Sequence, residues 1–384
     1  MGNYMNIKNI YAKIFSGASA ALVLCLAVSF GIFRESLPCV INSSPDSPVA
    51  ECGFSGTTLR RTSDGYAYYL ANFPIKTAEV VEKQRRSVIL CGTPFGIKIR
   101  SDGVMVVKTA DRSPARSAGI KEGDIIKSVN GETVRTNSDI SRAVQRNSDE
   151  TYVVLERSDR ELCFTFEPKR EADGLKMGIF VRDSAAGVGT LTFIEPKTKT
   201  FGGLGHSVSD VTTGDTVPLL SGEITKAEIY GIVKGKSGSA GELCGLIFPE
   251  TETGKICSNT EAGIFGEYCG EVSGEEYPAA FRQEVKTGAA TVITTTDGSS
   301  PKQYSIEIER INLFDLDGSK SMVIRITDPV LLEETGGIVR GMSGSPIIQD
   351  GKFVGAVTHV LVNDPTRGYA IFAENMLSNA VGSD

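Results

Sequence analysis

Gly341-Met342-Ser343-Gly344-Ser345-Pro346 lies close to the C-terminal end of a chain of 384 residues, between the apolar runs Ser321 to Ile326 and Phe353 to Val357. A turn built from such small residues can hold one hydroxyl outward and leave backbone N–H groups facing the same side. A serine nucleophile and its oxyanion hole need this combination. The stretch therefore predicts a nucleophile at Ser343.

A serine hydroxyl at its normal pKa needs a general base, usually a histidine. The chain has two histidines, His206 and His359. His206 follows the glycine-rich stretch Phe201 to Gly205, which we interpret as a turn that presents the ring. His359 lies in the strand-like run Val354 to Val362 and stays as the competing base, although a structural role fits that run better.

Asp328 is the predicted carboxylate partner of the base. It follows the strand-like run Met322 to Thr327 and precedes Pro329, which should end the strand and place the carboxylate at its edge. The order His206, Asp328, Ser343 is that of chymotrypsin-like double barrels and differs from the orders in subtilisins and α/β-hydrolases. Read singly, His206 is a turn histidine and Asp328 a strand-end cap; together they predict a triad.

Composition excludes several other function classes. The formal net charge of −7 argues against non-specific nucleic-acid binding, which needs a basic surface. With two histidines the chain has no His-Glu-x-x-His motif, and its eight cysteines show no Cys-x-x-Cys spacing. We therefore predict no nucleic-acid partner, no metal and no cofactor.

The N-terminal part contains an uncharged run of membrane-spanning length, Ile14 to Phe33. Lys8 and Lys13 precede it, so we expect residues 1–13 in the cytoplasm, a transmembrane anchor at 14–33 and the rest outside. The alternative is a cleaved signal peptide, but the run is long for one and no cleavage site follows it cleanly. Residues 34–85 are rich in proline, serine and charge, and we expect a tether with one strand at Gly65 to Leu70.

Residues 86–170 change to short strands and two short helices. Ser113-Pro114 begins one helix, Thr136 and Asp139 form a capping box at the start of the next, and Asn130-Gly131 predicts a hairpin. This order resembles a PDZ domain of the bacterial, protease-associated kind. The resemblance implies a peptide-binding loop at Phe95, Gly96 and Ile97, where an added strand would dock. The alternative is a module that only packs against its neighbour.

Residues 171–384 are rich in short strands and glycine and poor in long helical periods. This pattern predicts a pair of antiparallel barrels, so the chain as a whole should be mainly β. Its order would be a transmembrane helix, a PDZ module and a chymotrypsin-like double β-barrel.

Four stretches carry a family resemblance: Phe201 to Asp210, Ile326 to Pro329, Gly341 to Ile347 and Thr358 to Tyr369. With the preceding anchor and PDZ module they closely resemble the SpoIVB serine peptidases of endospore-forming bacteria. The resemblance implies His206 as general base, Asp328 as orienting carboxylate and Ser343 as nucleophile. It also implies the amides of Gly341 and Ser343 as oxyanion donors.

The same resemblance implies partners and a location. Such peptidases are exported from the forespore into the space between the two spore membranes and cleave themselves near the N-terminus. They cut the outer domain of a membrane protein that regulates an intramembrane protease, which activates a late mother-cell sigma factor. We therefore expect a membrane-protein ectodomain, the chain's own tether and the membrane as partners.

Two further hypotheses remain open. One is a non-catalytic PDZ adaptor that recruits a partner to the membrane during sporulation. The other is a quality-control protease of the HtrA type, but those place the PDZ domain after the protease, whereas here it precedes His206.

Overall fold

The computed structural model describes residues 21–35, 37–45, 56–63, 65–146, 149–312 and 318–380. The chain forms two compact units, Met1–Arg85 and Arg86–Asp384. The predicted cytoplasmic segment 1–13 and the first part of the predicted anchor, 14–20, lie outside the described residues. Within the described ranges we find no helix that combines the length and the apolar character needed to span a bilayer.

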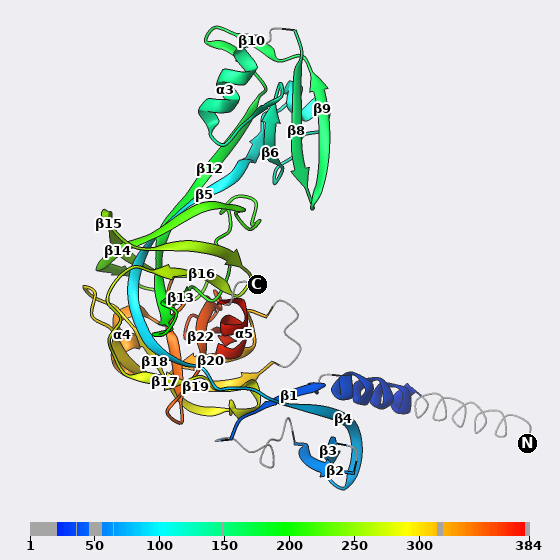
Figure 1. The fold of residues 1–384 in the computed structure, drawn as a ribbon, viewed down its shortest axis with the longest axis vertical. Helices are drawn as coiled ribbons and strands as arrows, with labels where there is room; N and C mark the ends of the chain where they lie inside the picture. The colour runs from blue at the N-terminus through cyan, green and yellow to red at the C-terminus, as the bar shows by residue number, and fades with distance from the viewer. Residues whose placement is uncertain are drawn as a thin grey trace, which may run out of the picture. The chain divides into compact units, whose positions relative to one another are not determined.

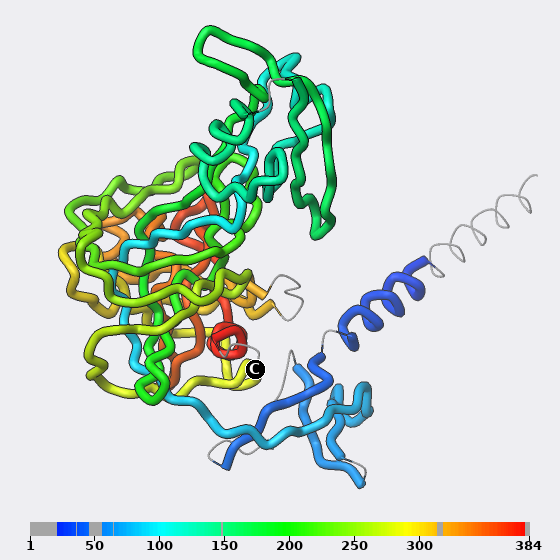
Figure 2. The backbone as a smooth tube through the Cα atoms, turned by 45° about the horizontal axis from the view of Figure 1, so that its top comes forward, coloured from blue at the N-terminus to red at the C-terminus, as the bar shows by residue number. Residues whose placement is uncertain are grey.

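The N-terminal unit contains a helix at 21–35 and a small sheet, both in blue in Figure 2. Its strands pair in the order β1-β4-β3-β2, and their bounds are β1 (Val40–Ser43), β2 (Thr58–Thr62), β3 (Gly65–Leu70) and β4 (Phe73–Glu82). Leu37, Ile41 and Tyr68 are almost completely buried. The predicted strand at Gly65 to Leu70 is confirmed. The prediction of an extended tether is wrong for the described residues, because their apolar side chains are enough to close a small core.

The second unit contains two closed barrels of six strands each (Figure 1). The first barrel has the order β5-β12-β13-β16-β15-β14, with β14 pairing back to β5. Its strands are β5 (Ser87–Thr109), β12 (Ile179–Ile194), β13 (Thr200–Gly203), β14 (Leu219–Val233), β15 (Glu242–Thr260) and β16 (Gly263–Tyr268). Phe201, Ile99, Ile224 and Ile264 fill its interior.

The second barrel has the order β18-β19-β20-β23-β22-β21. Its strands are β18 (Gly288–Thr294), β19 (Lys302–Ile311), β20 (Met322–Ile326), β21 (Pro346–Gln349), β22 (Lys352–Val360) and β23 (Arg367–Phe372). Numbered along the chain, both barrels have the order 1-2-3-6-5-4. Helix α4 (Pro329–Thr335) joins β20 to β21, and α5 (Ala373–Ala380) ends the described chain. The short β17 (Glu276–Pro278) and η2 (Arg282–Glu284) connect the barrels.

A small α/β module is inserted between the first two strands of the first barrel. It contains α2 (Pro114–Ala118), β6 (Ile125–Val129), β7 (Glu132–Thr133), α3 (Asn137–Gln145), β8 (Thr151–Arg157), β9 (Arg160–Phe166), β10 (Lys169–Glu171) and β11 (Gly174–Lys176). β5 leaves the barrel to enter this module and β12 returns from it, so the two strands run side by side through both parts (Figure 1).

The insertion corrects the expected boundaries. Residues 87–101 of β5 were expected in the PDZ module, but they pair with β12 and β14 as the first strand of the barrel. The module also continues beyond residue 170, because Leu175 of β11 and Met177 belong to its core, and Ile179 and Val181 at the start of β12 pack against it. The helix start at Ser113, the capping box at Thr136 and the hairpin at Asn130-Gly131 are confirmed.

Candidate active site

Ser343 lies in the turn between α4 and β21, against the first barrel. Gly341 and Gly344 on either side of it have φ values of +96° and +95°, which side chains other than glycine rarely adopt. A Cβ atom at Gly344 would lie 2.1 Å from the carbonyl oxygen of Thr190 and 2.6 Å from the amide nitrogen of Leu204. The glycine therefore lets the serine turn touch β12 and the loop that carries His206.

Thr190 of β12 fixes the orientation of the serine turn. Its hydroxyl donates to the carbonyl of Gly341 at 2.7 Å, and its amide donates to the carbonyl of Ser343 at 3.1 Å. Within the described part of the chain, the N–H groups of Gly341 and Ser343 have no hydrogen-bond acceptor. Two unused donors beside a serine hydroxyl are the arrangement that an oxyanion hole requires.

His206 is carried by the loop that follows β13. A Cβ atom at Gly205 would lie 3.0 Å from Cγ2 of Thr358, so this loop packs directly on β22. The ring centroids of His206 and His359 are 5.0 Å apart. The structure thus brings His206, His359 and the Ser343 turn to one place, where the two barrels meet.

The tautomer of His206 follows from its hydrogen bond. Its Nδ1 lies 2.7 Å from the carbonyl oxygen of Ser207, which can only accept, so Nδ1 carries the proton. In the neutral ring Nε2 then holds the free lone pair that a general base needs. Burial lowers the pKa of His206 below 6.5, against smaller raising effects of the Ser207 hydrogen bond and the charge of Glu261. The ring is therefore neutral and basic at neutral pH.

The Ser343 hydroxyl donates to the carbonyl of Thr358 at 2.7 Å and not to His206. Rotation of the serine side chain away from this carbonyl is thus a step that must precede proton transfer. His359 follows Thr358 directly. Its pKa falls to about 4 through desolvation and then through the electrostatic effects of His206 and Lys320.

Asp328 is not joined to the histidines. It is the N-cap of α4: its Oδ1 accepts from the amides of Val330 at 3.0 Å and Leu331 at 3.2 Å. Its Oδ2 accepts from the amide of Ser305 at 3.2 Å. Among the described residues it makes no hydrogen bond to His206. Of the three predicted triad residues, the structure brings two together and uses the third as a helix cap.

Two residues of this site were not identified from the sequence. Thr190 lies in a strand of ordinary composition, and Glu261 lies in the turn between β15 and β16. No local motif marks either residue. Only the pairing of the strands, which the sequence pattern does not give, could have found them.

The structure corrects the prediction that Phe95, Gly96 and Ile97 bind a peptide. Phe95 and Ile97 are 3% and 5% exposed in the core of the first barrel. Gly96 pairs with strands on both sides, and a Cβ atom there would lie 2.5 Å from the hydroxyl of Thr225. The prediction is wrong because this glycine serves close packing of strands, not a ligand loop.

The module has an open strand edge elsewhere. Residues 179–183 of β12 run beside β5 on one side and have no strand partner on the other among the described residues, since pairing with β13 begins only at Leu191. Helix α3 lies beside this segment, since the carboxylate of Asp183 accepts from the amide of Asn137 at 3.0 Å. An unpaired edge next to a helix is the geometry in which a peptide adds as a strand.

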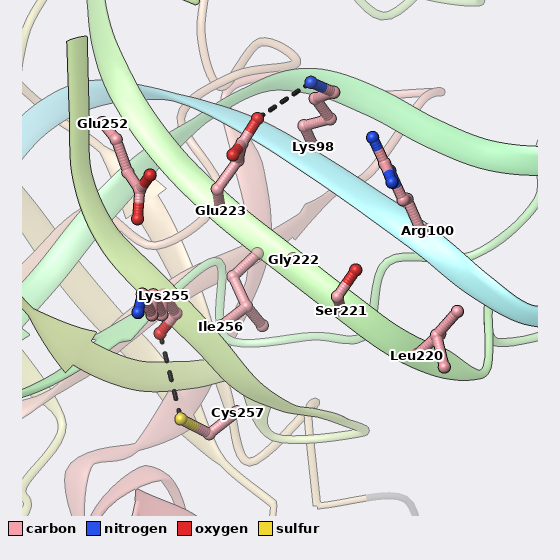
Figure 3. Close-up of a pocket in the computed structure, with 10 residues that line it drawn as sticks. All are labelled: Lys98, Arg100, Leu220, Ser221, Gly222, Glu223, Glu252, Lys255, Ile256 and Cys257. Carbon is pink, nitrogen blue, oxygen red and sulfur yellow. Dashed lines mark hydrogen bonds and ion pairs between the residues drawn. The ribbon is translucent and has the colours of Figure 1, made fainter.

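A cavity of about 530 Å³ lies away from this site, on the outside of the first barrel (Figure 3). Lys98, Arg100 and Lys255 line it together with Glu223 and Glu252, and Lys98 pairs with Glu223 at 2.9 Å. These charges are mixed, and no histidine or candidate nucleophilic serine of the active site reaches the cavity. The described residues also contain no group of three or more side chains that could hold a metal.

Comparison with protein families gives two matches. The family described as "SpoIVB peptidase S55" matches residues 173–377, which is more than half of the chain. The PDZ domain family matches residues 106–157, inside the inserted module.

Several curated proteins are similar to parts of the chain. Serine protease HTRA1 of Xenopus tropicalis is 33% identical over 69 residues, which cover 18% of this chain and 15% of HTRA1. The regulator of sigma-W protease RasP of Bacillus subtilis is 35% identical over 82 residues, or 21% of this chain and 19% of RasP. Serine protease HTRA2 of Drosophila ananassae is 30% identical over 127 residues, which cover 30% of this chain and 28% of HTRA2. The chain thus spans less than a third of the length of these relatives.

Two solved structures are similar at low identity. The PDZ domain of the SdrC-like protein of Listeria monocytogenes is 19% identical, with a TM-score of 0.19, and covers 21% of this chain and 87% of that domain. The inactive form of the Rv3671c protease is 14% identical, with a TM-score of 0.30, and covers 51% of this chain and 85% of that protease.

Proposed function

Because the chain belongs to the SpoIVB peptidase S55 family, we propose that it is a serine endopeptidase with Ser343 as nucleophile and His206 as general base. One observation carries this proposal. The Ser343 turn has two backbone N–H groups without an acceptor among the described residues, and it contacts the loop of a neutral histidine whose Nε2 is unprotonated.

The geometry supports a two-step hydrolysis. Ser343 turns from the carbonyl of Thr358, gives its proton to Nε2 of His206 and attacks the carbonyl carbon of a peptide bond. The amides of Gly341 and Ser343 receive the negative oxygen of the tetrahedral intermediate. His206 then gives the proton to the leaving amine, and water hydrolyses the acyl-enzyme with His206 again as base.

The proposed substrate is the extracytoplasmic domain of a membrane protein that regulates an intramembrane protease, together with the chain's own N-terminal segment. The family match supports this substrate, and the PDZ match supports recognition of an extended peptide. We further propose that the protein is attached to the membrane through residues 14–33 or exported. Its place would be the space between the spore membranes, where it would signal to the mother-cell sigma factor.

A fluorophosphonate probe tests the chemistry without knowledge of the substrate, because it reacts with an activated serine. Wild-type protein should be labelled and Ser343→Ala should not. Ser345→Ala is the matched control, since that hydroxyl is buried and bonded to Thr294 at 2.9 Å. Equal labelling of wild type and Ser343→Ala would contradict the proposal. Mass spectrometry of the same samples would then identify any self-cleavage site.

A second candidate is a non-catalytic adaptor, favoured by the open edge of β12 at residues 179–183. It predicts that sporulation in the source organism survives Ser343→Ala and fails when this edge is blocked. The peptidase proposal predicts that sporulation fails in both variants.

A further inference from the structure

The helix at 21–35 is apolar on all sides. Residues 21–33 carry no charged side chain. Leu22, Val23, Leu24 and Leu26 are 61–65% exposed, and neighbouring residues of an α-helix point about 100° apart, so these side chains cover most of its circumference. A helix that is apolar all round is either buried in protein or surrounded by lipid. The described residues of the N-terminal unit do not cover it.

The end of this helix is fixed to the start of β4. The guanidinium of Arg34 donates to the carbonyl of Ile75 at 2.8 Å. The ammonium group of Lys76 donates to the carbonyl of Glu35 at 3.2 Å and to that of Leu37 at 2.8 Å. The last turn of the helix and the first residues of β4 are therefore neighbours.

The strand register places the turn between β3 and β4, residues 70–73, at the same end of the sheet. β1 pairs in parallel with β4, with Val40 opposite Glu79, so the chain that leads back from β1 to the helix runs toward the start of β4. That start is also the closed end of the hairpin, because Leu70 pairs with Phe73 across the turn. The helix and this hairpin tip thus lie at one end of the sheet.

The hairpin tip exposes two large apolar side chains beside a basic group. Phe73 is 75% and Leu70 is 40% exposed. The guanidinium of Arg60 donates to the carbonyl of Ala71 at 3.2 Å and lies 4.9 Å from the centroid of the Tyr69 ring. Apolar and aromatic side chains next to cations are typical of surfaces that enter the headgroup region of a bilayer, where the rings reach the acyl chains and the cations meet anionic headgroups.

We propose that the hairpin tip is a second membrane contact of this protein. With the helix at 21–35 in the bilayer, Leu70 and Phe73 insert among the headgroups of the leaflet at which the helix ends. A lipid surface fits better than a protein partner, because the helix beside the tip is apolar all round and Arg34 and Arg60 complement anionic headgroups. This inference rests on the proposed membrane attachment and is independent of the peptidase chemistry.

Tryptophan fluorescence tests this contact, because the chain contains no tryptophan. Phe73→Trp places a probe at the tip, where the exposed ring leaves the core unchanged. Val81→Trp is the matched control, since Val81 is also exposed and lies on the same strand, eight residues or about 26 Å further along. Leu70→Trp repeats the measurement from the other side of the turn.

The full chain is reconstituted into vesicles of phosphatidylglycerol and phosphatidylethanolamine, with and without brominated acyl chains, which quench tryptophan on contact. We expect the emission of Phe73→Trp and Leu70→Trp to shift to shorter wavelength in vesicles and to be quenched by the brominated lipid. Val81→Trp should show neither change.

Two results would overturn the proposal although the protein floats with the vesicles. One is a tip tryptophan that keeps the emission of a water-exposed residue. The other is a shift without quenching by brominated lipid, which would mean that protein, such as a second copy of the chain, covers the tip. Protein that does not float with the vesicles contradicts the proposed membrane attachment and this contact with it. Fluorophosphonate labelling of the same samples reports the peptidase separately, so its failure leaves the fluorescence result valid.

Discussion

Thr190 holds two carbonyls of the serine turn at once, through its hydroxyl and its amide. The carbonyls of Gly341 and Ser343 are turned toward β12, and this fixes the peptide units that follow each of the two residues whose N–H groups are the proposed oxyanion donors. The chemistry of the turn thus depends on a residue more than 150 positions earlier in the chain, from the other barrel.

We expect Thr190→Val to slow fluorophosphonate labelling by about tenfold or more, because the carbonyl of Gly341 loses its donor and can turn. Thr192→Val is the matched control. Thr192 lies on the same strand and is fully buried, but its hydroxyl has no partner among the described residues. Its removal should leave labelling unchanged and stability equal or higher. Equal rates for the two variants would contradict this role of Thr190.

The two histidines also predict how stability depends on pH. Both have folded pKa values below 6.5, that of His359 at about 4. As pH falls from about 7 to 5, the unfolded chain binds protons that the folded chain does not, so the free energy of unfolding should fall. His359→Gln should reduce that loss, as measured by urea unfolding at several pH values. A variant with the same slope as wild type would show that His359 is not shifted.

At the scale of residues, the types of the functional side chains could be predicted from the sequence, but the groups that they contact could not. Ser343 and His206 come from local patterns, and the structure places their loops together. Asp328 has the right type and order for a triad, yet its position before Pro329 also suits a helix cap, and the backbone amides hold it there. Sequence order cannot decide between the two roles, because the distance to His206 depends on how the barrels pack.

At the scale of elements, helix ends and tight hairpins were the most predictable. Ser113, Thr136 and Asn130-Gly131 act through neighbours three or fewer residues away, so their sequence determines the outcome. β13 was harder to predict, because the glycine-rich sequence from Phe201 to Gly203 is typical of a turn. A Cβ atom at Gly202 would lie 2.6 Å from the ring of Phe193, so the glycine serves packing inside a strand.

The cap of α4 gives a prediction about this element. Asp328→Ala removes the acceptor of two helix amides and should lower the free energy of unfolding by about 1–2 kcal/mol. Asp328→Asn should keep most of that stability, since asparagine caps helices equally well. Chemical denaturation of the two variants measures the difference. An equal loss in both would mean that the charge, and not the cap, stabilises this region.

At the scale of the molecule, the main surprise is where the PDZ module lies. A mainly β chain with two barrels follows from its many short strands and glycines, and the structure has both. The insertion of the module cannot be predicted from this pattern, because β5 and β12 are single long strands. Each belongs to the module at one end and to the barrel at the other. A local pattern cannot show that one strand serves two cores.

The insertion predicts that the barrels fold without the module. Arg100 and Ser184 pair across β5 and β12, so an Asn-Gly turn can replace residues 101–183 and close the hairpin. Asp210 would lose Arg182 and stay buried as an unpaired charge, so the variant also carries Asp210→Asn, which keeps the acceptor for Thr212 and Thr213.

We expect this shortened protein to unfold cooperatively and to label at Ser343 within about tenfold of wild type, because a domain inserted at neighbouring chain positions leaves its host intact. Cooperative unfolding is measured by circular dichroism and labelling by the fluorophosphonate probe. The same deletion with Asp210 retained is the control and should be less stable. A folded but unlabelled protein would mean that the module acts on the serine turn, and β12 is the direct route, since it runs from the open edge at 179–183 to Thr190.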